Sequence, residues 1–279
     1  MSLEAQIGFI GIGSMGESIL AGLIRSKHIT KDCISVIGKG TKRAAHVAQQ
    51  YSVKHQSSVI ELVQECSIIF LCVKPKDLPS IGKQLNEIDL SEKLIISTLA
   101  GVSSNTLHHI FPSSYLVRSI PNIASEICKG VTIWFAHEST PKHITKYAHD
   151  LLSALGDSIE VDYEHNIELA SPISGAAPAF MGLFVEAMVD AAVYIGLERN
   201  LSTQLVLQSL MGSCGLIHEA NGKAHDVRHR VTSPGGLTAV CMAKLEAAGF
   251  RTAIMDAVIA GREKTEKLGR SNDFLTKGD

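Results

Sequence analysis

Three glycines near the start of the chain have the spacing that could hold a phosphate. Residues 7–16 read IGFIGIGSMG, a short apolar stretch that ends in the pattern G-x-G-x-x-G. Gly11 permits a tight turn out of a strand, Gly13 lets the backbone approach a pyrophosphate, and Gly16 lets the next helix pack closely on the strand. The free N–H groups at the start of that helix, expected over residues 17–25, favour negative charge. The spacing therefore predicts a dinucleotide site.

The residues after the second predicted strand indicate which dinucleotide binds. Strand 34–37 is followed by Gly38-Lys39-Gly40-Thr41-Lys42-Arg43. A carboxylate at this point accepts hydrogen bonds from the ribose of NAD, whereas cations suit the 2′-phosphate of NADP. Three cations and a hydroxyl favour NADPH. The alternative is that Lys42 and Arg43 form only the solvated first turn of a helix.

Three further strand ends are expected to complete the same crevice. Pro75 ends strand 67–73 and places Lys74 at the carboxyl edge of the sheet, where ligands bind in open α/β folds. An ordinary loop lysine is the alternative for Lys74. Asn122 closes another strand and is expected to line the crevice. Small residues after strand 94–98 would allow close approach of the nicotinamide half: Leu99, Ala100 and Gly101.

Composition narrows the class of protein. The 279 residues suggest one large or two ordinary domains, and a net charge of -2 gives no basic excess for nucleic acid or an anionic membrane. Apolar runs such as residues 68–73 are shorter than the roughly 20 residues of a membrane span, and no leader pattern is seen. The six cysteines form no C-x-x-C pair and are expected to be reduced core residues. A cytoplasmic protein without membrane or nucleic-acid partners is predicted.

The order of elements predicts two domains. Residues 1–163 alternate strand-like and helix-like segments, as in a parallel sheet covered on both faces by helices. Residues 164–279 are predicted to be all helical. Within residues 1–163, helices are expected over residues 42–51 and 140–154. The expected strands are 6–10, 34–37, 67–73, 94–98, 114–119, 131–135 and 158–161.

The second half has the three- and four-residue spacing of helices. Gly196 offers a stop for the first of these helices, and Ser202 an N-cap for a second that runs to Glu219. Two more are expected over 239–248 and 250–268, and residues 269–279 are expected to be frayed. One buried stripe is predicted from the apolar positions Ile173, Ala177, Phe180, Phe184, Ala187, Met188, Ala191 and Ile195.

Several separated motifs resemble those of the pyrroline-5-carboxylate reductase family over nearly the whole chain. They are GFIGIGSM at 8–15, VKP at 73–75, RSIPN at 118–122, ISGAAPAF at 173–180 and VTSPGGLT at 231–238, followed by LE at 245–246 and GFR at 249–251. The resemblance implies an α/β fold, with an N-terminal Rossmann-type doubly wound sheet and an all-helical dimerisation domain. It also implies a homodimer, commonly assembled into a decamer, that reduces 1-pyrroline-5-carboxylate to L-proline with NADPH or NADH.

The resemblance implies roles for individual residues. Contacts with the substrate are implied for Asn221, Val231, Gly236, Leu237 and Thr238, with Thr238 as the catalytic residue. Contacts with the cofactor are implied for Ile10, Gly11, Gly13, Ser14, Met15, Lys39, Cys72, Val73, Lys74, Pro75, Thr98, Leu99, Ala100, Asn122 and Arg230.

The segment SPGGLT at 233–238 is compatible with this chemistry on its own terms. Its backbone N–H groups can hold a carboxylate, and Thr238 can bond the nitrogen of a cyclic imine. A simple helix-to-helix turn is the alternative. Thr238 is too weak an acid to protonate the ring unaided, so a water molecule or a substrate protonated in solution must supply the proton.

Departures from the family pattern leave alternative functions open. The family usually has SGSGPAY where this chain has SGAAPAF at 174–180, and Asn221 stands where some members have glutamate. A non-catalytic NADPH-binding paralogue and a reductase of a related cyclic imine are therefore kept as alternatives. A β-hydroxyacid dehydrogenase is disfavoured because helix 174–196 lacks a lysine. The HDVRH run at 225–229 resembles a zinc motif without a third ligand, and no metal is expected.

Overall fold

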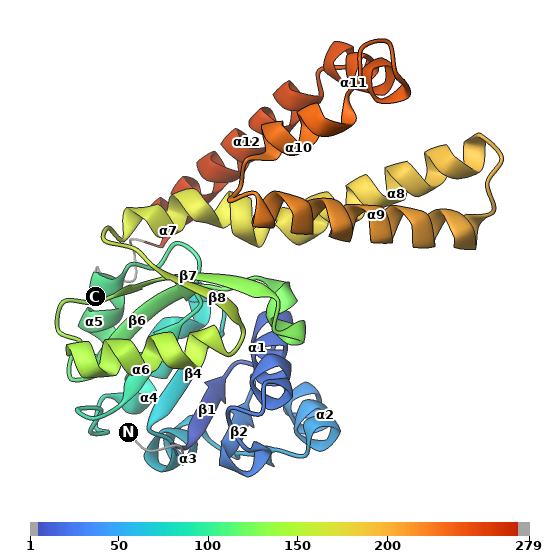
Figure 1. Cartoon of the computed structure of the whole chain (residues 1–279). Coiled ribbons are helices and arrows are strands. Elements are labelled where there is room, and N and C mark those ends of the chain that lie inside the picture. The colour runs from blue at the N-terminus through green and yellow to red at the C-terminus, as the bar shows by residue number, and fades with distance from the viewer. Residues whose placement is uncertain (1–4, 273–279) are drawn as a thin grey trace. The chain divides into compact units, whose positions relative to one another are not determined.

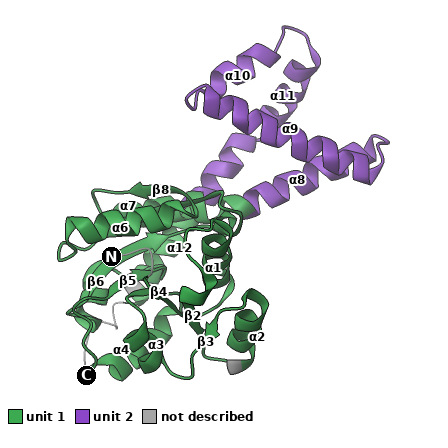
Figure 2. Ribbon diagram, turned by 60° about the horizontal axis from the view of Figure 1, so that its bottom comes forward, with its two compact units in different colours: residues 1–178, 261–279 green, residues 179–260 purple. Residues whose placement is uncertain are grey.

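The computed structural model describes residues 5–272, which fall into two compact units (Figure 2). The first, here called the sheet unit, comprises residues up to Pro178 together with those from Gly261 onward. The second, the helical unit, is Ala179–Ala260. Each unit is described by itself. The sequence predicted a division by function, between residues 163 and 164. The two compact units divide the chain elsewhere and do not test that division, which stays a prediction.

The sheet unit is built on eight strands in the order β3-β2-β1-β4-β5-β6-β7-β8. Neighbouring strands are parallel except β6 and β7, which are antiparallel. The first six positions follow the strand order of dinucleotide-binding folds, which reverses beside β1. The strands are β1 Ile7–Ile10, β2 Ile34–Ile37, β3 Lys54–His55, β4 Ile68–Leu71, β5 Leu94–Ser97, β6 Tyr115–Ile120, β7 Gly130–Ala136 and β8 Gly156–Glu160.

Alternate side chains of the central strands enter two separate cores. Phe9 of β1 lies in register with Phe70 of β4, and their rings stack 5.0 Å apart in one core. Ile10 and Leu71, one position further along, enter the other. Helices α1, α2 and α6 cover the first face, and α3, α4 and α5 cover the second (Figure 1). The doubly wound α/β fold expected from the sequence is confirmed.

The helices of the sheet unit agree with the alternating pattern. They are α1 Ser14–Arg25, α2 Thr41–Tyr51, α3 Val59–Glu65, α4 Leu78–Leu85, α5 Ser104–Ile110, α6 Lys142–Ser153 and α7 His165–Ala170. Short turns add η1 Lys31–Cys33, η2 Pro75–Asp77, η3 Ile123–Ile127 and the π-helical η4 Ser171–Gly175. The seven expected strands lie within about two residues of their observed bounds, while β3, whose two residues are exposed, was not predicted.

One aromatic residue ties the edge strand β8 to its neighbour β7. Trp134 of β7 is fully buried in the first core. Its indole N–H donates a 2.8 Å hydrogen bond to the hydroxyl of Ser158 in β8. Because buried indole N–H groups need an acceptor, this bond fixes the ring against the neighbouring strand.

Long helices make up the rest of the chain. They are α8 Ala177–Tyr194, α9 Arg199–Glu219, α10 Ala224–Val231, α11 Leu237–Ala247 and α12 Phe250–Ser271. Within the helical unit, the rings of Phe184 and Phe250 lie 6.3 Å apart and join α8 to α12. Gly196 follows α8 with φ +106°, as expected for a helix stop. The expected frayed end is partly wrong, because α12 continues to Ser271; residues 273–279 lie outside the described residues.

The predicted N-cap of α9 is wrong. Glu198 caps this helix, because its carboxylate accepts a 2.9 Å hydrogen bond from the N–H of Leu201. Ser202 lies inside the first turn and returns its hydroxyl to the carbonyl of Glu198. Serine is a common N-cap, but it also bonds the carbonyl four residues back, so its type alone did not fix the boundary.

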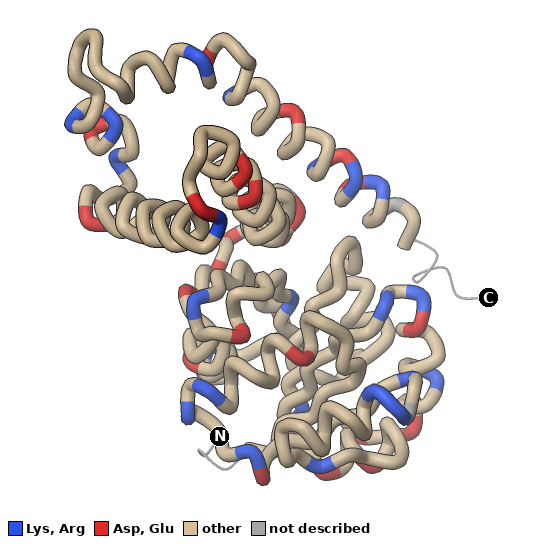
Figure 3. The backbone as a smooth tube through the Cα atoms, turned by 90° about the vertical axis from the view of Figure 1, so that its right-hand side faces the viewer, with Lys and Arg blue, Asp and Glu red and all other residues tan. Residues whose placement is uncertain are grey.

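The apolar stripe expected to be buried is largely exposed. The exposed fraction is 60% for Ile173, 44% for Met188 and 78% for Ile195. Periodicity fixes which side chains share a face, but it does not say what covers that face. Charges are sparse here: α8 carries only Glu186 and Asp190, and much of its length is uncharged (Figure 3). The helical unit therefore presents apolar surface that this chain leaves uncovered.

One helical stretch also has the length and composition of a membrane span. Among the described residues, His165–Tyr194 is the stretch that qualifies, since 18 consecutive residues within it have a mean hydropathy of 1.5. The sequence-based expectation that all apolar runs are too short overlooked it. Its glycine, alanine and serine residues break up the aliphatic runs while keeping the average apolar.

The expectation for the cysteines is only partly right. All six are free, and Cys66 is buried. However, Cys214 in α9 and Cys241 in α11 are exposed. Both helices also carry exposed apolar side chains, such as Met211 in α9 and Val240 in α11.

The close contact between α1 and η3 gives a stability prediction. A Cβ added at Gly22 would overlap the carbonyl oxygen of Ser125 and lie 2.8 Å from a methyl of Leu155. We expect Gly22→Ala to lower the free energy of unfolding by about 1–3 kcal/mol, measured by urea denaturation with circular dichroism. Gly40→Ala is the control, since nothing lies within 4 Å of a Cβ there. Equal stability of the two variants would contradict the packing argument.

Candidate active site

The glycine turn after β1 has the geometry that a close phosphate approach requires. Gly11 has φ +94°, and its N–H donates a 2.8 Å hydrogen bond to the carbonyl of Ile37. A Cβ on Gly11 would lie 2.7 Å from the backbone of Cys72, and one on Gly16 would lie 2.6 Å from the carbonyl oxygen of Gly11. At Gly13, the N-cap of α1, nothing lies within 4 Å of such a Cβ. Two of the glycines are thus needed for packing, and the third leaves space.

Two cavities open beside this turn, at the place where the strand order reverses. One, of about 350 Å³, has an apolar wall formed by Ile37, Val59 and Ile81. The other, of about 320 Å³, includes Gly13 and the start of α1. Both volumes suit parts of a nucleotide: a flat base in the first and phosphate groups in the second.

The second cavity is strongly cationic. Four cations line it, against the single carboxylate of Asp77: Lys39, Arg43, Lys74 and Lys76. Lys39 Nζ lies 2.7 Å from Asp77 Oδ1. Arg43 is held by Glu17 at 2.9 Å and by the carbonyl of Ile12 at 2.9 Å. Arg43 is thus fixed as part of the cavity wall. The alternative, in which Lys42 and Arg43 form only a solvated helical turn, does not account for these contacts of Arg43.

The wall residues after β4 have different chemical characters. Cys72 and Val73 line the cationic cavity together with Lys74. Burial raises the pKa of the Cys72 thiol to about 12, so this cysteine stays protonated and contributes shape rather than reactivity. Pro75 starts η2, which carries Lys76 and Asp77 into both cavities. Sequence reasoning missed these two residues, although the run VKPKD carried a signal.

The residues predicted for the nicotinamide half lie elsewhere on the same sheet edge. Thr98 donates its hydroxyl to the carbonyl of Leu71 at 3.3 Å, and Leu99 is buried. Asn122 is also buried, and its amide N–H donates to the carbonyl of Ser174 at 3.2 Å, while its side-chain oxygen has no partner within residues 5–272. Neither of the two cavities above includes Thr98, Leu99, Ala100 or Asn122.

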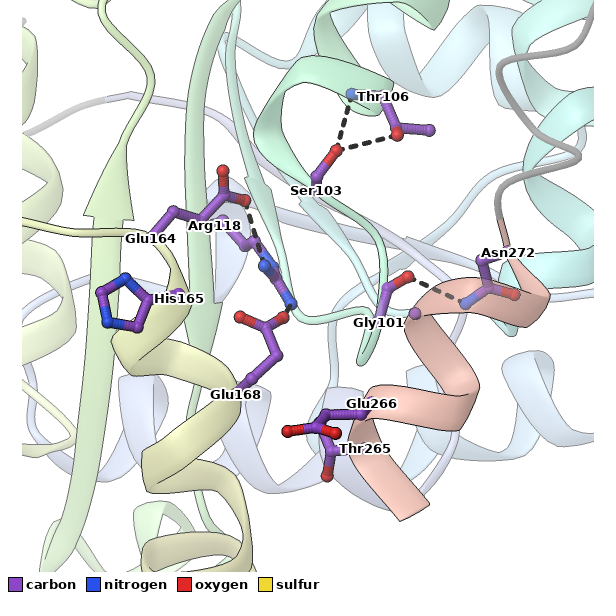
Figure 4. A pocket seen from close by; sticks show the side chains of 11 residues that line it. Gly101, Ser103, Thr106, Arg118, Glu164, His165, Glu168, Thr265, Glu266 and Asn272 are labelled. Carbon is purple, nitrogen blue, oxygen red and sulfur yellow. Dashed lines mark hydrogen bonds and ion pairs between the residues drawn. The ribbon is translucent and has the colours of Figure 1, made fainter. Parts of the chain in front are cut away.

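A third cavity, of about 400 Å³, lies beside this edge and was not predicted. Arg118 of β6 is 2% exposed, and its guanidinium pairs with Glu164 at 3.0 Å and with Glu168 of α7 (Figure 4). Asn272, just after α12, donates to the carbonyl of Gly101 at 3.0 Å. The buried ion pairs fasten β6 to α7, where removing one partner would be costly.

The predicted substrate turn lies in the helical unit. Gly235 has φ +69°, and the N–H of Gly236 returns to the carbonyl of Ser233 at 3.0 Å. Gly236 is the N-cap of α11, so Leu237 and Thr238 form the first turn of an eleven-residue helix. Their N–H groups are therefore among those without a partner inside the helix. An anion-binding helix start, expected from SPGGLT, is present in geometry.

The other predicted residues of this unit lie at or just after the ends of α9 and α10. Asn221 follows α9 in the left-handed region, with φ +52°. Arg230 and Val231 end α10, and both are exposed. Arg230 is the one predicted cofactor residue outside the sheet unit. Within residues 5–272, no group of three histidine, cysteine or acidic side chains could hold a metal ion.

Comparison with known proteins gives a consistent result. Residues 164–268 match the family model described as pyrroline-5-carboxylate reductase dimerisation, and residues 6–101 match the one described as NADP oxidoreductase, coenzyme F420-dependent. The pyrroline-5-carboxylate reductase of Synechocystis is 32% identical, covering 96% of this chain and 100% of that protein. The Mycobacterium tuberculosis reductase is 34% identical, covering 95% and 97%.

The chain belongs to the pyrroline-5-carboxylate reductase family. The fold agrees: the crystal structure of Plasmodium falciparum pyrroline carboxylate reductase with NADP bound has a TM-score of 0.87 and 30% identity, covering 95% of this chain and 98% of that one. The family predicted from the motifs is confirmed. So is an oxidoreductase activity that reduces 1-pyrroline-5-carboxylate with a nicotinamide cofactor.

The residues present in this reductase fit a phosphorylated dinucleotide. The glycine cradle leaves room at Gly13, and cations line the adjoining cavity. No carboxylate follows β2 within the run Gly38–Arg43. Gly11, Gly13, Lys39, Val73 and Lys74 would hold the phosphates and the ribose.

The open space at Gly13 allows a substitution that affects cofactor binding without affecting folding. We expect Gly13→Ala to weaken NADPH binding at least tenfold, because the new methyl group would enter the phosphate cradle. Titration of NADPH fluorescence measures the affinity. The melting temperature should change little, since a Cβ there meets nothing within 4 Å. Unchanged NADPH affinity in the folded variant would place the phosphates elsewhere.

Proposed function

We propose that this chain forms L-proline from 1-pyrroline-5-carboxylate in the cytoplasm, with NADPH as the preferred donor and NADH as a weaker one. Residues 1–163 bind the dinucleotide, and residues 164–279 bind the substrate and form the dimer. The observation that carries the proposal is the match to pyrroline-5-carboxylate reductases over 96% of the chain, which includes both the glycine turn and the turn before α11.

The start of α11 is the proposed substrate clamp. Main-chain N–H groups at Leu237 and Thr238 would hold the carboxylate, as helix N-termini hold anions. Gly236, whose own N–H already donates to the carbonyl of Ser233, is assigned to the substrate site as the N-cap residue. Asn221 and Val231 are assigned to the wall of the same site. Arg230, at the end of α10, is assigned to the cofactor.

The Thr238 hydroxyl is the proposed partner of the ring nitrogen. A hydrogen bond there would orient the imine and draw charge from its carbon. When bound, the dinucleotide supplies the hydride for that carbon. A hydroxyl cannot protonate the ring unaided, so the proton comes from water or from substrate already protonated. The protein contributes orientation and electrostatic stabilisation.

The cofactor residues act through backbone and charge. Gly11, Gly13, Ser14 and Met15 form the phosphate-facing start of α1, with Ile10 at the end of the preceding strand. Lys39 is assigned to the ribose phosphate. The remaining contacts are assigned to residues at the ends of β4, β5 and β6: Cys72, Val73, Lys74, Pro75, Thr98, Leu99, Ala100 and Asn122.

A second copy of this chain is the proposed cover for the apolar helices. The uncovered side chains of α8 and α9 include Leu183 and Met211, 69% and 62% exposed. The family model matched by residues 164–268 is one of dimerisation. This assignment also accounts for the apolar stretch His165–Tyr194 without a membrane. Association of dimers into a decamer is the finer proposal.

Steady-state kinetics tests the reaction and the role of Thr238. We expect NADPH oxidation with pyrroline-5-carboxylate. For Thr238→Val we expect kcat/KM for the imine to fall about 10- to 100-fold, with little change in the KM for NADPH, because one hydrogen bond to a charged ring is lost. Thr252→Val in α12 is the control, because Thr252 is also a helical threonine and its side chain is exposed.

The same assay decides between the alternatives. NADPH binding without turnover would favour a non-catalytic paralogue. Faster turnover of a six-membered imine would favour a related imine reductase. Normal kinetics in Thr238→Val would reject its catalytic assignment.

Light scattering during size-exclusion chromatography tests the dimer. We expect the wild-type mass to be at least twice the 29.9 kDa of one chain. Leu183→Glu should shift the mass toward the monomer, because a buried unpaired charge opposes association. Ile60→Glu in α3 of the sheet unit, 37% exposed, is the control and should leave the mass unchanged. A monomeric wild-type protein would overturn the proposal.

A further inference from the structure

An ion pair bridges the two walls of the cofactor cleft. Lys39 follows β2, and Asp77 ends η2 after β4; their Nζ and Oδ1 atoms lie 2.7 Å apart. In the sheet, β2 and β4 are the two neighbours of β1. The pair therefore spans the end of β1, where the glycine turn begins.

The pair also lies at the junction of the two cavities. Lys39 and Asp77 line both the apolar cavity, with Ile37 and Val59, and the cationic cavity, with Gly13. A nucleotide with its base in the first cavity and its phosphates in the second must pass its ribose through this junction. The ribose 2′-position is the place where NADP carries a phosphate and NAD a hydroxyl.

The two partners favour opposite cofactors. Lys39 would attract a 2′-phosphate, whereas Asp77 repels it and can accept a hydrogen bond from a 2′-hydroxyl. The hydrogen bond from Lys39 is the main cause that lowers the pKa of Asp77, so this carboxylate is ionised at neutral pH. Gly38 leaves the end of β2 without a carboxylate, and Asp77 supplies one from the opposite wall.

We propose that Asp77 is a specificity-determining residue, which competes with the 2′-phosphate for Lys39 and so moderates the preference for NADPH over NADH. The pair is easily opened, because the Lys39 side chain is 83% exposed and exposed ion pairs contribute little. The proposal rests on the dinucleotide site proposed above.

Binding of two fragments to the full-length protein tests it. Adenosine 2′,5′-bisphosphate carries the distinguishing phosphate, and AMP lacks it. By isothermal titration calorimetry at low salt, Asp77→Asn should tighten the bisphosphate about two- to fivefold relative to AMP. Lys39→Met should weaken the bisphosphate and leave AMP unchanged. The gain in Asp77→Asn should shrink in high salt, since the charges are exposed.

Asp89→Asn is the matched control. It removes the same charge from a loop outside the cofactor cavities and keeps an oxygen that can accept from the N–H of Ser91. Its fragment ratio should equal that of the wild type. In Asp77→Asn the ratio of kcat/KM for NADPH to that for NADH should rise by the same factor as the fragment ratio.

Two negative results have different meanings. If both fragments bind and Asp77→Asn leaves their ratio unchanged, Asp77 does not set specificity, and the dinucleotide site stands. If neither fragment binds the wild-type protein, the proposed dinucleotide site is itself wrong, and the role of Asp77 falls with it.

Discussion

Crowding between β1 and β4 at the glycine turn governs how the first helix meets the sheet and where the cleft opens. Gly11 has no space for a Cβ against the backbone of Cys72, and Gly16 has none against Gly11. This close approach brings the start of α1 down onto the sheet. It also opens the crevice where the strand order reverses, with phosphate-binding N–H groups at its base. Any side chain at these positions would separate the helix from the strand.

Charge in the cleft is arranged by the same geometry. The loops after β2 and β4 each bring cations to the crevice, because parallel strands end at the same edge. Arg43 is braced by Glu17 and the carbonyl of Ile12, so it is held in place before any ligand binds. In the part of the chain that the structure describes, Lys39 pairs only with Asp77, across the cleft. Arg43 is therefore preorganised, whereas Lys39 can leave Asp77 and pair with a bound phosphate instead.

Much of the sheet unit could be predicted from the sequence, because apolar runs ended by glycine or proline mark strands that lead into turns. β3 was not predicted because its two residues, Lys54 and His55, are exposed and show no alternation of apolar and polar side chains. The cap of α9 was misplaced because serine has two competing bonding modes. The Lys39–Asp77 pair was beyond reach for another reason: 38 residues separate its members, and only the strand order brings them together. The apolar spacing in the second half predicted helices, and helices are present, but the predicted burial of the stripe was wrong because exposure depends on packing that periodicity does not encode.

The placement of Trp134 has an optical consequence. It is the one tryptophan of the chain, fully buried in β7 with its indole N–H bonded to Ser158. Intrinsic fluorescence excited at the red edge of indole absorption therefore reports on the sheet unit, and the helical unit is silent in that signal. Loss of helical signal without a change in emission would identify a state in which only the sheet remains ordered.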